Sequence, residues 1–323
     1  MSNTTEQAQT ETTAESNVFL ELLGELGDHH GLIIGPYHVA DLPLIFYDDG
    51  FHFYPTVNKM EEAGIFTMHN KHIVKTSDHT PPALDLSITN FVFFQWLVMI
   101  LLFFFFKKAS KRYKEKPNSA PRGIQNMFEV LVTYVRDEIV VPNIPSKNAV
   151  YRLLPYFVTL FFFILGLNLI GLIPGGHTAT SSLGVTAALA VTAFLVINIT
   201  SIKEAGLGNY FKHLLGGAPP WLFFIMIPIE ILSMFIKPFA LTIRLFANMT
   251  AGHVVLFALL GLIFYFKTIL ISPAIVGFSV FIYFLELLVA FIQAYIFTML
   301  TAIFVGLAIG EHGSDAHAEH ATH

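Results

Sequence analysis

The run ITNFVFFQWLVMILLFFFF (Ile88–Phe106) decides the class of fold. It contains 19 residues without a charged side chain, and an α-helix of this length crosses about 30 Å of hydrocarbon. The run ends at KKASKRYKEK (Lys107–Lys116), which contains six basic residues. Basic residues accumulate on the cytoplasmic side of membrane helices, so the sequence predicts a spanning helix whose Lys107 end is cytoplasmic.

The composition of the whole chain agrees with a membrane location. Of its 323 residues, 54% are hydrophobic and 13% are charged, and the charged share is about half that of a soluble domain. This excludes an ordinary soluble enzyme and gives no basic surface for nucleic acid. The chain has no cysteine, which excludes disulfides, thiolate metal sites and cysteine nucleophiles.

Four further apolar stretches follow the first. Leu153–Ile173 and Ser182–Ile202 each contain 21 residues, which fits a single crossing. Trp221–Phe266 and Pro273–Ile309 are longer. With one crossing for each stretch, we predict an all-α integral membrane protein with about five membrane helices, an external N-terminus and a cytoplasmic C-terminus.

The last two stretches are too long for helices that run along the membrane normal. Their 46 and 37 residues correspond to about 69 Å and 55 Å of helix against a core of about 30 Å. Two interpretations remain open from length alone. Either Pro228 and Pro238 break the first stretch into a re-entrant pair, or both stretches form long, steeply tilted helices.

The N-terminal residues 1–87 form a small segment that we predict to lie outside the cytoplasm. They contain 13 acidic residues and 3 lysines. The first 16 residues are polar and are predicted to be disordered, and residues 17–27 to form a short surface helix. In LIFYDDGFHFYP, two aromatic runs flank Asp49-Gly50, which predicts a hairpin because both residues tolerate positive φ angles.

Two further segments are predicted to lie on the cytoplasmic side of the membrane. Residues 122–142 place apolar side chains on one helical face, which predicts an amphipathic helix on the membrane surface. Residues 311–323 are rich in histidine and are predicted to form a flexible tail that binds no metal. The predicted organisation is therefore an N-terminal segment (1–87), a membrane domain (88–310) and this tail.

Five ionisable residues interrupt the long apolar stretches: Glu230, Lys237, Arg244, His253 and Glu286. A charge at bilayer depth costs about 2.5–3.5 kcal/mol on translocon scales, so such residues mark polar pathways or paired sites. Histidine and carboxylate groups exchange protons near neutral pH when their pKa values are tuned, whereas arginine stays charged.

Spacing gives these residues an order along the helices. Glu230, Lys237 and Arg244 follow one another at intervals of seven, and Glu286 and Gln293 repeat that interval. This predicts a proton path in which Arg244 acts as an electrostatic barrier. A structural alternative remains open, in which Arg244 is only neutralised by Glu286 or Glu230.

Three motifs carry a resemblance to a known family. They are KPFALTIRLFANMTAGH (Lys237–His253), LELLVAFIQAYIFTML (Leu285–Leu300) and NLIGLIPG (Asn168–Gly175). Together they resemble subunit a of the F-type ATP synthases, and the similarity covers about residues 88–310. The resemblance favours inclined helices for the two long stretches, because the last two helices of this family run steeply tilted along a ring of c subunits.

The resemblance also implies roles for individual residues. Arg244 matches the essential arginine that separates two aqueous half-channels. The positions that line the outer half-channel are matched by Asn248, His253, Glu286 and Gln293. Glu230 matches an acidic position on the cytoplasmic side, and Asn168 matches an asparagine that we assign to the proton pathway. Gly252 is predicted to permit close helix packing beside His253.

The sequence departs from the family in three places. Some bacterial members carry Glu where His253 stands and His where Glu286 stands, so the pair is exchanged here. Gly171 occupies a position where many bacterial members have Asp. The N-terminal 87 residues are longer than in common members.

The function implied by the resemblance is that of a proton-translocating stator subunit of a rotary ATP synthase, which is no enzyme on its own. Its implied partners are the c-subunit ring, the peripheral-stalk b subunits, the rest of the complex and membrane lipid. No cofactor is expected, and the implied location is the bacterial inner membrane. Two alternatives remain: a stand-alone ion channel or secondary transporter with buried Arg, His and Glu, and a membrane scaffold in which Arg244 forms only a structural ion pair.

Overall fold

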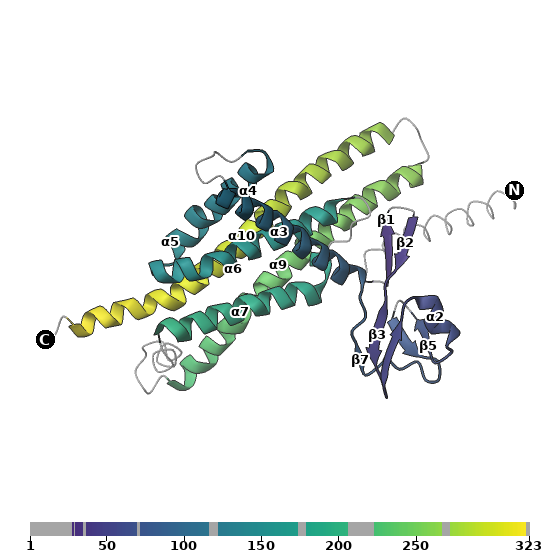
Figure 1. Ribbon diagram of the computed structural model, residues 1–323, viewed down its shortest axis with the longest axis horizontal. Helices are drawn as coiled ribbons and strands as arrows, with labels where there is room; N and C mark the ends of the chain where they lie inside the picture. Colours follow the sequence, from purple (N-terminus) through teal and green to yellow (C-terminus); the bar gives the residue numbers. More distant parts are fainter. Residues whose placement is uncertain are drawn as a thin grey trace. The chain divides into compact units, whose positions relative to one another are not determined.

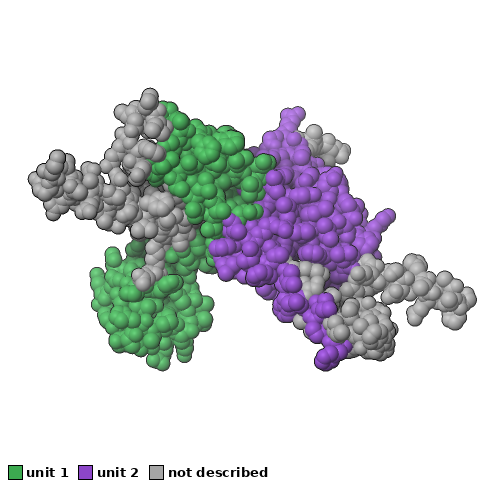
Figure 2. All heavy atoms as spheres, turned by 180° about the vertical axis from the view of Figure 1, so that it is seen from behind, with its two compact units in different colours: residues 1–98, 167–182, 248–289 green, residues 99–166, 183–247, 290–323 purple. Residues whose placement is uncertain are grey.

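A computed structural model describes most of the chain: residues 28, 30–34, 37–69, 72–115, 122–173, 179–205, 223–266 and 272–320 (Figure 1). The predicted disordered residues 1–16 and the predicted helix at residues 17–27 lie outside these ranges. The chain divides into two compact units, coloured green and purple in Figure 2. Unit 1 comprises residues 1–98, 167–182 and 248–289, and unit 2 comprises residues 99–166, 183–247 and 290–323.

The N-terminal part of unit 1 is built from short strands and one helix. In chain order these are β1 (Gly31–Ile34), β2 (Tyr37–Asp41), β3 (Leu44–Tyr47), β4 (Phe51–Tyr54), α2 (Val57–Glu62), β5 (Phe66–His69), β6 (His72–Lys75) and β7 (Leu84–Asp85). The described strands form antiparallel pairs β1–β2 and β5–β6 and a three-stranded sheet in the order β4-β3-β7.

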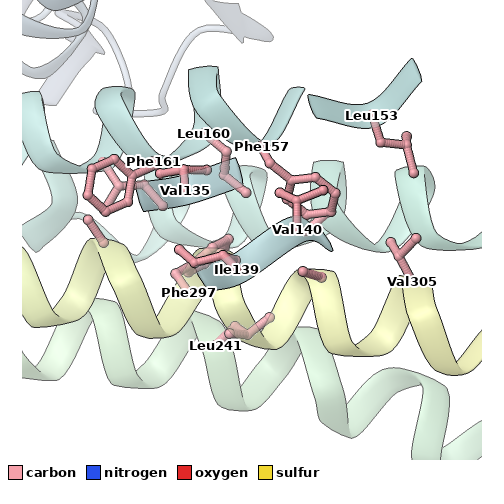
Figure 3. Packing of buried hydrophobic residues seen from close by; sticks show 14 of the residues in the cluster. Val135, Ile139, Val140, Leu153, Phe157, Leu160, Phe161, Leu241, Phe297 and Val305 are labelled. Carbon is pink, nitrogen blue, oxygen red and sulfur yellow. The ribbon is translucent and has the colours of Figure 1, made fainter. Parts of the chain in front are cut away.

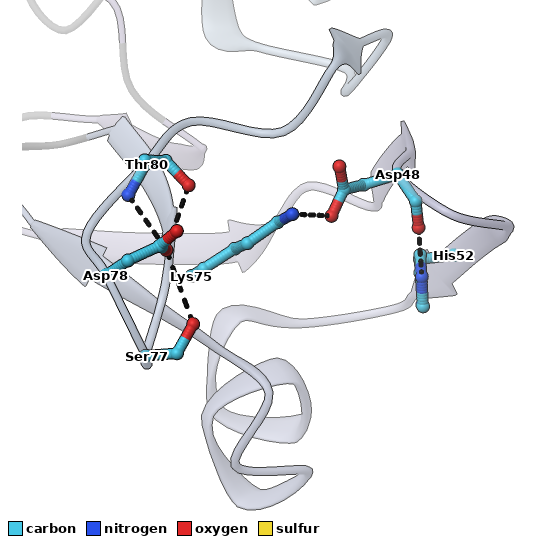
Figure 4. Close-up of polar contacts among 6 residues, drawn as sticks. All are labelled: Asp48, His52, Lys75, Ser77, Asp78 and Thr80. Carbon is cyan, nitrogen blue, oxygen red and sulfur yellow. Dashed lines mark hydrogen bonds and ion pairs between the residues drawn. The ribbon is translucent and has the colours of Figure 1, made fainter.

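The predicted hairpin at Asp49-Gly50 is confirmed. β3 and β4 pair antiparallel with Tyr47 opposite Phe51, and Asp49 adopts a φ angle of 51°. Asp tolerates this left-handed conformation because its short side chain forms local hydrogen bonds. An ion pair with a residue outside the hairpin also holds the loop: Lys75 Nζ lies 2.7 Å from Asp48 Oδ2 (Figure 4). This contact joins the β3–β4 hairpin to the end of β6.

One face of the three-stranded sheet packs into a small core. Leu44 and Phe46 of β3 are fully buried against Met60 of α2, Phe66 of β5 and Ile73 of β6. The rings of Phe46 and Phe66 meet edge to face, with centroids 4.6 Å apart. α2 begins at Thr56, whose side chain accepts a hydrogen bond from the Lys59 N–H group. The N-terminal segment therefore has its own apolar core.

Five helices in the described residues have the length and composition to cross a membrane, as predicted. They are α3 (Asn90–Glu115), α6 (Lys147–Leu172), α7 (Leu183–Ala205), α9 (Phe223–Phe266) and α10 (Ser272–His320). A short 3-10 turn, η2 (Ala179–Ser181), precedes α7. The chain is thus a helical membrane protein that passes the bilayer several times.

The two long apolar stretches form uninterrupted helices. α9 has 44 residues and continues through Pro228 and Pro238, so the re-entrant alternative is not found. α10 has 49 residues. At 1.5 Å per residue these helices are about 66 Å and 74 Å long, which exceeds the thickness of a bilayer core. Their steep inclination remains a prediction.

The predicted amphipathic helix at residues 122–142 is present but is not a regular α-helix. It consists of α4 (Ile124–Tyr134), a π-helical segment η1 (Val135–Val140) and α5 (Val141–Asn143). Ile124 and Met127 at its start are exposed, whereas Val135, Ile139 and Val140 are fully buried in unit 2. The adjacent residues Ile139 and Val140 of this π-helical segment both belong to the core of unit 2.

The core of unit 2 joins five helical segments that are distant in sequence (Figure 3). Phe157 and Phe161 of α6 are fully buried, and Leu241 of α9 and Phe297 of α10 belong to the same cluster. α10 also approaches α5 at Gly306. A Cβ atom at this glycine would overlap the backbone carbonyl of Asn143. Only glycine allows this close approach of two backbones.

Candidate functional site

The centre of the candidate site is a contact between α9 and α10 in unit 1. His253 Nδ1 of α9 lies 3.9 Å from Glu286 Oε1 of α10. The two side chains are 12% and 11% exposed. The structure therefore brings together two of the residues that the sequence predicted for the proton path, and it does so in a largely buried position.

Gly252 makes room for Glu286 on the surface of α9. A Cβ atom at residue 252 would collide with Glu286 Oε1 and would lie 3.0 Å from its Cδ atom. Real Cβ atoms essentially never approach another heavy atom so closely. The space at Gly252 is therefore occupied by the Glu286 carboxyl group of α10, so the glycine accommodates a side chain of the neighbouring helix at this point.

The Glu286 carboxyl group is poorly solvated. Both of its oxygen atoms are buried, and neither has a hydrogen-bond partner among the described residues. An ionised carboxylate in an apolar environment is strongly unfavourable unless an opposite charge accompanies it. A protonated His253 supplies such a charge. The arrangement can therefore favour a protonated Glu286, or an ionised Glu286 beside a protonated His253.

Two buried hydroxyl groups on the same two helices were missed at the level of sequence. Thr250 Oγ1 of α9 and Ser279 Oγ of α10 are buried and have no hydrogen-bond partner in the described part of the chain. Ser279 precedes Glu286 by seven residues, the interval that also separates Glu286 from Gln293. Extending the seven-residue interval backward along α10 from Glu286 would have identified Ser279. Thr250 lies three residues before His253, nearly on the same helical face.

Asn168 occupies a second polar position in unit 1. It lies on α6, is fully buried, and its Oδ1 atom accepts a hydrogen bond of 2.8 Å from Thr180 Oγ1. Thr180 belongs to η2 and is also fully buried. The bond ties the end of α6 to the turn before α7 and satisfies polar groups within apolar helices.

Arg244 lies on α9 in unit 2, on the exposed side of the helix. Leu241 and Leu245, which lie within one turn of Arg244, are buried in the core of unit 2. The exposed side chains of α9 include the apolar Leu232, Phe235, Ile236, Phe239 and Ile243, and the polar Asn248, one turn beyond Arg244, is also exposed. Among the described side chains no ion pair includes Arg244. The guanidinium group is therefore exposed on a helix whose other described exposed side chains are mostly apolar.

The remaining predicted residues have different environments. Asn248 is exposed on α9 in unit 1, and Gln293 is buried on α10 in unit 2. The backbone of Glu230 belongs to α9, but its side chain lies outside the described residues. Within the described ranges, no three His, Cys, Asp or Glu side chains are grouped to hold a metal ion.

Comparison with known proteins gives one consistent result. The family model described as ATP synthase A chain matches residues 92–306. An ATP synthase subunit a from Chloroherpeton thalassium is 48% identical over 242 residues, covering 74% of this chain and 72% of that protein. One from Myxococcus xanthus is 44% identical over 292 residues, covering 88% of this chain and 94% of that protein. With Arg244, His253 and Glu286 all inside the matched range, this chain belongs to the ATP synthase A chain family.

Proposed function

We propose that this chain is the proton-translocating stator subunit of a rotary F-type ATP synthase. In this proposal, protons pass through two aqueous half-channels to and from carboxylates on a ring of c subunits. Arg244 keeps the half-channels electrically separate. The chain performs no chemical reaction on its own, because its task is to move protons between groups carried by different subunits.

The observation that carries the proposal is the position of Arg244. A permanently charged guanidinium group that is exposed on α9, a helix whose described exposed side chains are mostly apolar, needs a partner that is itself largely apolar and supplies an opposite charge. A ring of helices with one carboxylate each meets both requirements. Arg244 attracts a ring carboxylate that has lost its proton and repels a proton that would leak between the half-channels.

The proposed route to the ring uses the groups of unit 1. His253 and Glu286 exchange protons with one another, and the unpaired hydroxyl groups of Thr250 and Ser279 bind the water molecules that extend the route. Asn168, Asn248 and Gln293 line the outer half-channel. Glu230 acts on the cytoplasmic side of Arg244.

The proposal includes an orientation. We place the chain in a bacterial inner membrane, with the N-terminal segment outside and the C-terminal end of α10 in the cytoplasm. The basic end of α3, which contains Lys107, Lys108 and Lys111, supports this orientation. Peripheral-stalk b subunits and the rest of the synthase are the remaining partners.

The decisive experiment measures ATP-driven proton pumping in inverted membrane vesicles. Arg244→Gln removes the charge and keeps a polar side chain, and we expect pumping to be lost while ATP hydrolysis by the complex persists. Ile243→Ala is the matched control, because it changes the neighbouring exposed residue without changing the charge. The control should pump at nearly the normal rate.

The same preparation separates the rival functions. Purification together with a c-ring and ATP-hydrolysing subunits is expected for a stator subunit. A homogeneous particle that contains this chain alone and still conducts protons would identify a stand-alone channel. Full pumping by the Arg244→Gln variant would leave Arg244 as a structural residue only.

A further inference from the structure

One face of the β4-β3-β7 sheet is apolar across all three strands. The register places Tyr47 opposite both Phe51 and Leu84, and Ile45 opposite Phe53. Leu86 extends β7 opposite Ile45, since its N–H group donates to the Ile45 carbonyl at 2.8 Å. Residues directly opposite one another in a sheet share a face. We call this set the apolar sheet face: Ile45, Tyr47, Phe51, Phe53, Leu84 and Leu86.

The apolar sheet face is exposed in the structure. Five of its six side chains, all except Ile45, have between 52% and 69% of their surface accessible. The other face of the same sheet, with Leu44 and Phe46, is covered by α2 and by the β5–β6 hairpin. An antiparallel sheet with one solvated face normally carries polar residues there. An exposed patch of this kind marks a surface that contacts lipid or another molecule.

The sheet is connected to a membrane helix by a short, hydrogen-bonded segment. Ser87 bonds to both backbone groups of Ile45, at 3.1 Å and 3.3 Å. The Ile88 N–H group donates to the Pro43 carbonyl at 3.2 Å. α3 begins only two residues later, at Asn90. The sheet therefore continues almost to the point at which the chain enters the bilayer.

This connection limits how far the apolar sheet face can lie from lipid. The four residue-to-residue steps from Leu86 to Asn90 span at most about 14 Å, and the headgroup layer on each side of the core is roughly 5–8 Å thick. Figure 1 shows α2 and β5 beside β3 and β7 in the same part of unit 1. The face that α2 and the β5–β6 hairpin leave uncovered is therefore held within this short distance of the point at which the membrane helix begins.

We propose that the apolar sheet face rests on the headgroup region of the leaflet at which α3 begins. Phe and Leu side chains then enter the boundary between headgroups and acyl chains, and the Tyr47 hydroxyl group stays at the polar level, as aromatic residues do in the belts of membrane proteins. None of the six side chains carries a charge, so contact with lipid needs no specific headgroup charge. This docking is independent of the proposed proton path and assigns a role to the N-terminal segment.

The test uses spin labels on the full-length chain in vesicles of phosphatidylcholine and phosphatidylglycerol. The chain has no native cysteine, so single cysteines can be introduced and labelled without background. Phe53→Cys and Phe51→Cys place the label on the apolar sheet face. Glu62→Cys is the matched control, because Glu62 is exposed on α2, which covers the opposite face. The readout is the accessibility of each label to oxygen and to a water-soluble nickel complex.

We expect nickel accessibility to be several-fold lower at positions 51 and 53 than at position 62, with oxygen accessibility higher. High salt should leave this difference unchanged, since no charge pair is involved. Equal nickel accessibility at all three positions would overturn the proposal. Protection that arises only when the other synthase subunits are added would identify a protein as the occupant. Coupling between two labels at position 53 would identify a second copy of the chain, and either result would also overturn the proposal.

Discussion

His253 Nδ1 lies 3.9 Å from Glu286 Oε1, within a contact of α9 and α10 at which Gly252 leaves space for the carboxyl group. This separation is longer than a hydrogen bond. It is short enough for the charges of the two groups to attract one another strongly when both are ionised. Under the proposed function, a proton that passes between them needs a smaller separation or one bridging water molecule.

Replacing Glu286 with Gln removes the group that binds and releases the proton while keeping its size. Proton transfer by a positioned side chain contributes about 100-fold to 10,000-fold in rate, so we expect proton flux to fall by at least on the order of tenfold. ATP-driven acidification of inverted vesicles measures it. Glu138→Gln changes an exposed carboxyl group of η1 and serves as the control. Normal flux in the Glu286 variant would show that this residue lies off the proton path.

Replacing Gly252 with Ala places a methyl group where the Glu286 carboxyl group now lies. The flexible end of Glu286 must then move, so we expect a folded complex with several-fold slower proton pumping. Gly277→Ala is the matched control, because a Cβ atom at Gly277 meets no heavy atom within 4 Å. Equal pumping rates for the two alanine variants would contradict a functional role for the gap at Gly252.

Replacing Gly306 with Ala should act on stability. The new methyl group would overlap the Asn143 carbonyl, which belongs to the backbone and cannot rotate away. Overpacking of this kind costs about 1–3 kcal/mol, and we expect a lower melting temperature of the purified chain in detergent. Gly277→Ala should leave the melting temperature unchanged or raise it, because alanine favours a helix over glycine. A Gly306 variant as stable as that control would refute the close backbone contact.

Acidification should lower the stability of the N-terminal segment, because His30 becomes protonated. Burial lowers the pKa of His30 below its ordinary value of 6.5, although the nearby Asp85 and Asp28 oppose the shift. The unfolded segment therefore binds more protons than the folded one below pH 6.5, so the free energy of unfolding falls as the pH falls through this range. Hydrogen exchange at β1 and β2, corrected for intrinsic rates, should accelerate between about pH 7.5 and pH 5.5.

The His30→Phe variant separates this effect from general acid sensitivity. It should exchange with little dependence on pH, because the buried group no longer titrates. His69→Gln changes an exposed histidine of β5 and should behave like the unaltered chain. An identical acid response in the His30→Phe variant would assign the effect to another group.

Features that depend on local chemistry were predictable from the sequence. The hairpin at Asp49-Gly50 follows from the backbone freedom of two adjacent residues, and the membrane helices follow from the lengths of their apolar runs. The length of the stretch could not predict whether Pro228 and Pro238 interrupt the helix, because proline can kink a helix or be accommodated within it. Only the family resemblance favoured the uninterrupted α9.

Features that join distant parts of the chain could not be predicted. Ser87 bonds to Ile45 across 42 residues, and no local pattern indicates this pairing. The gap at Gly252 was expected, but its occupant, Glu286, is known only from the packing of α9 and α10. The environment of Arg244 was not predictable either. Its seven-residue spacing from Lys237 placed both residues on one side of a helix, but the spacing could not decide whether that side is buried in a core or exposed.

The glycine at position 306 also has a consequence for how α10 can move along its own axis. Only a residue without a Cβ atom can pass the Asn143 carbonyl, and the positions four residues away on the same side of α10 are Ala302 and Gly310. Sliding by one turn in one direction brings a methyl group against that carbonyl, whereas the other direction brings a second glycine about 6 Å along the helix. This contact therefore resists displacement of α10 along its axis more strongly in one direction than in the other.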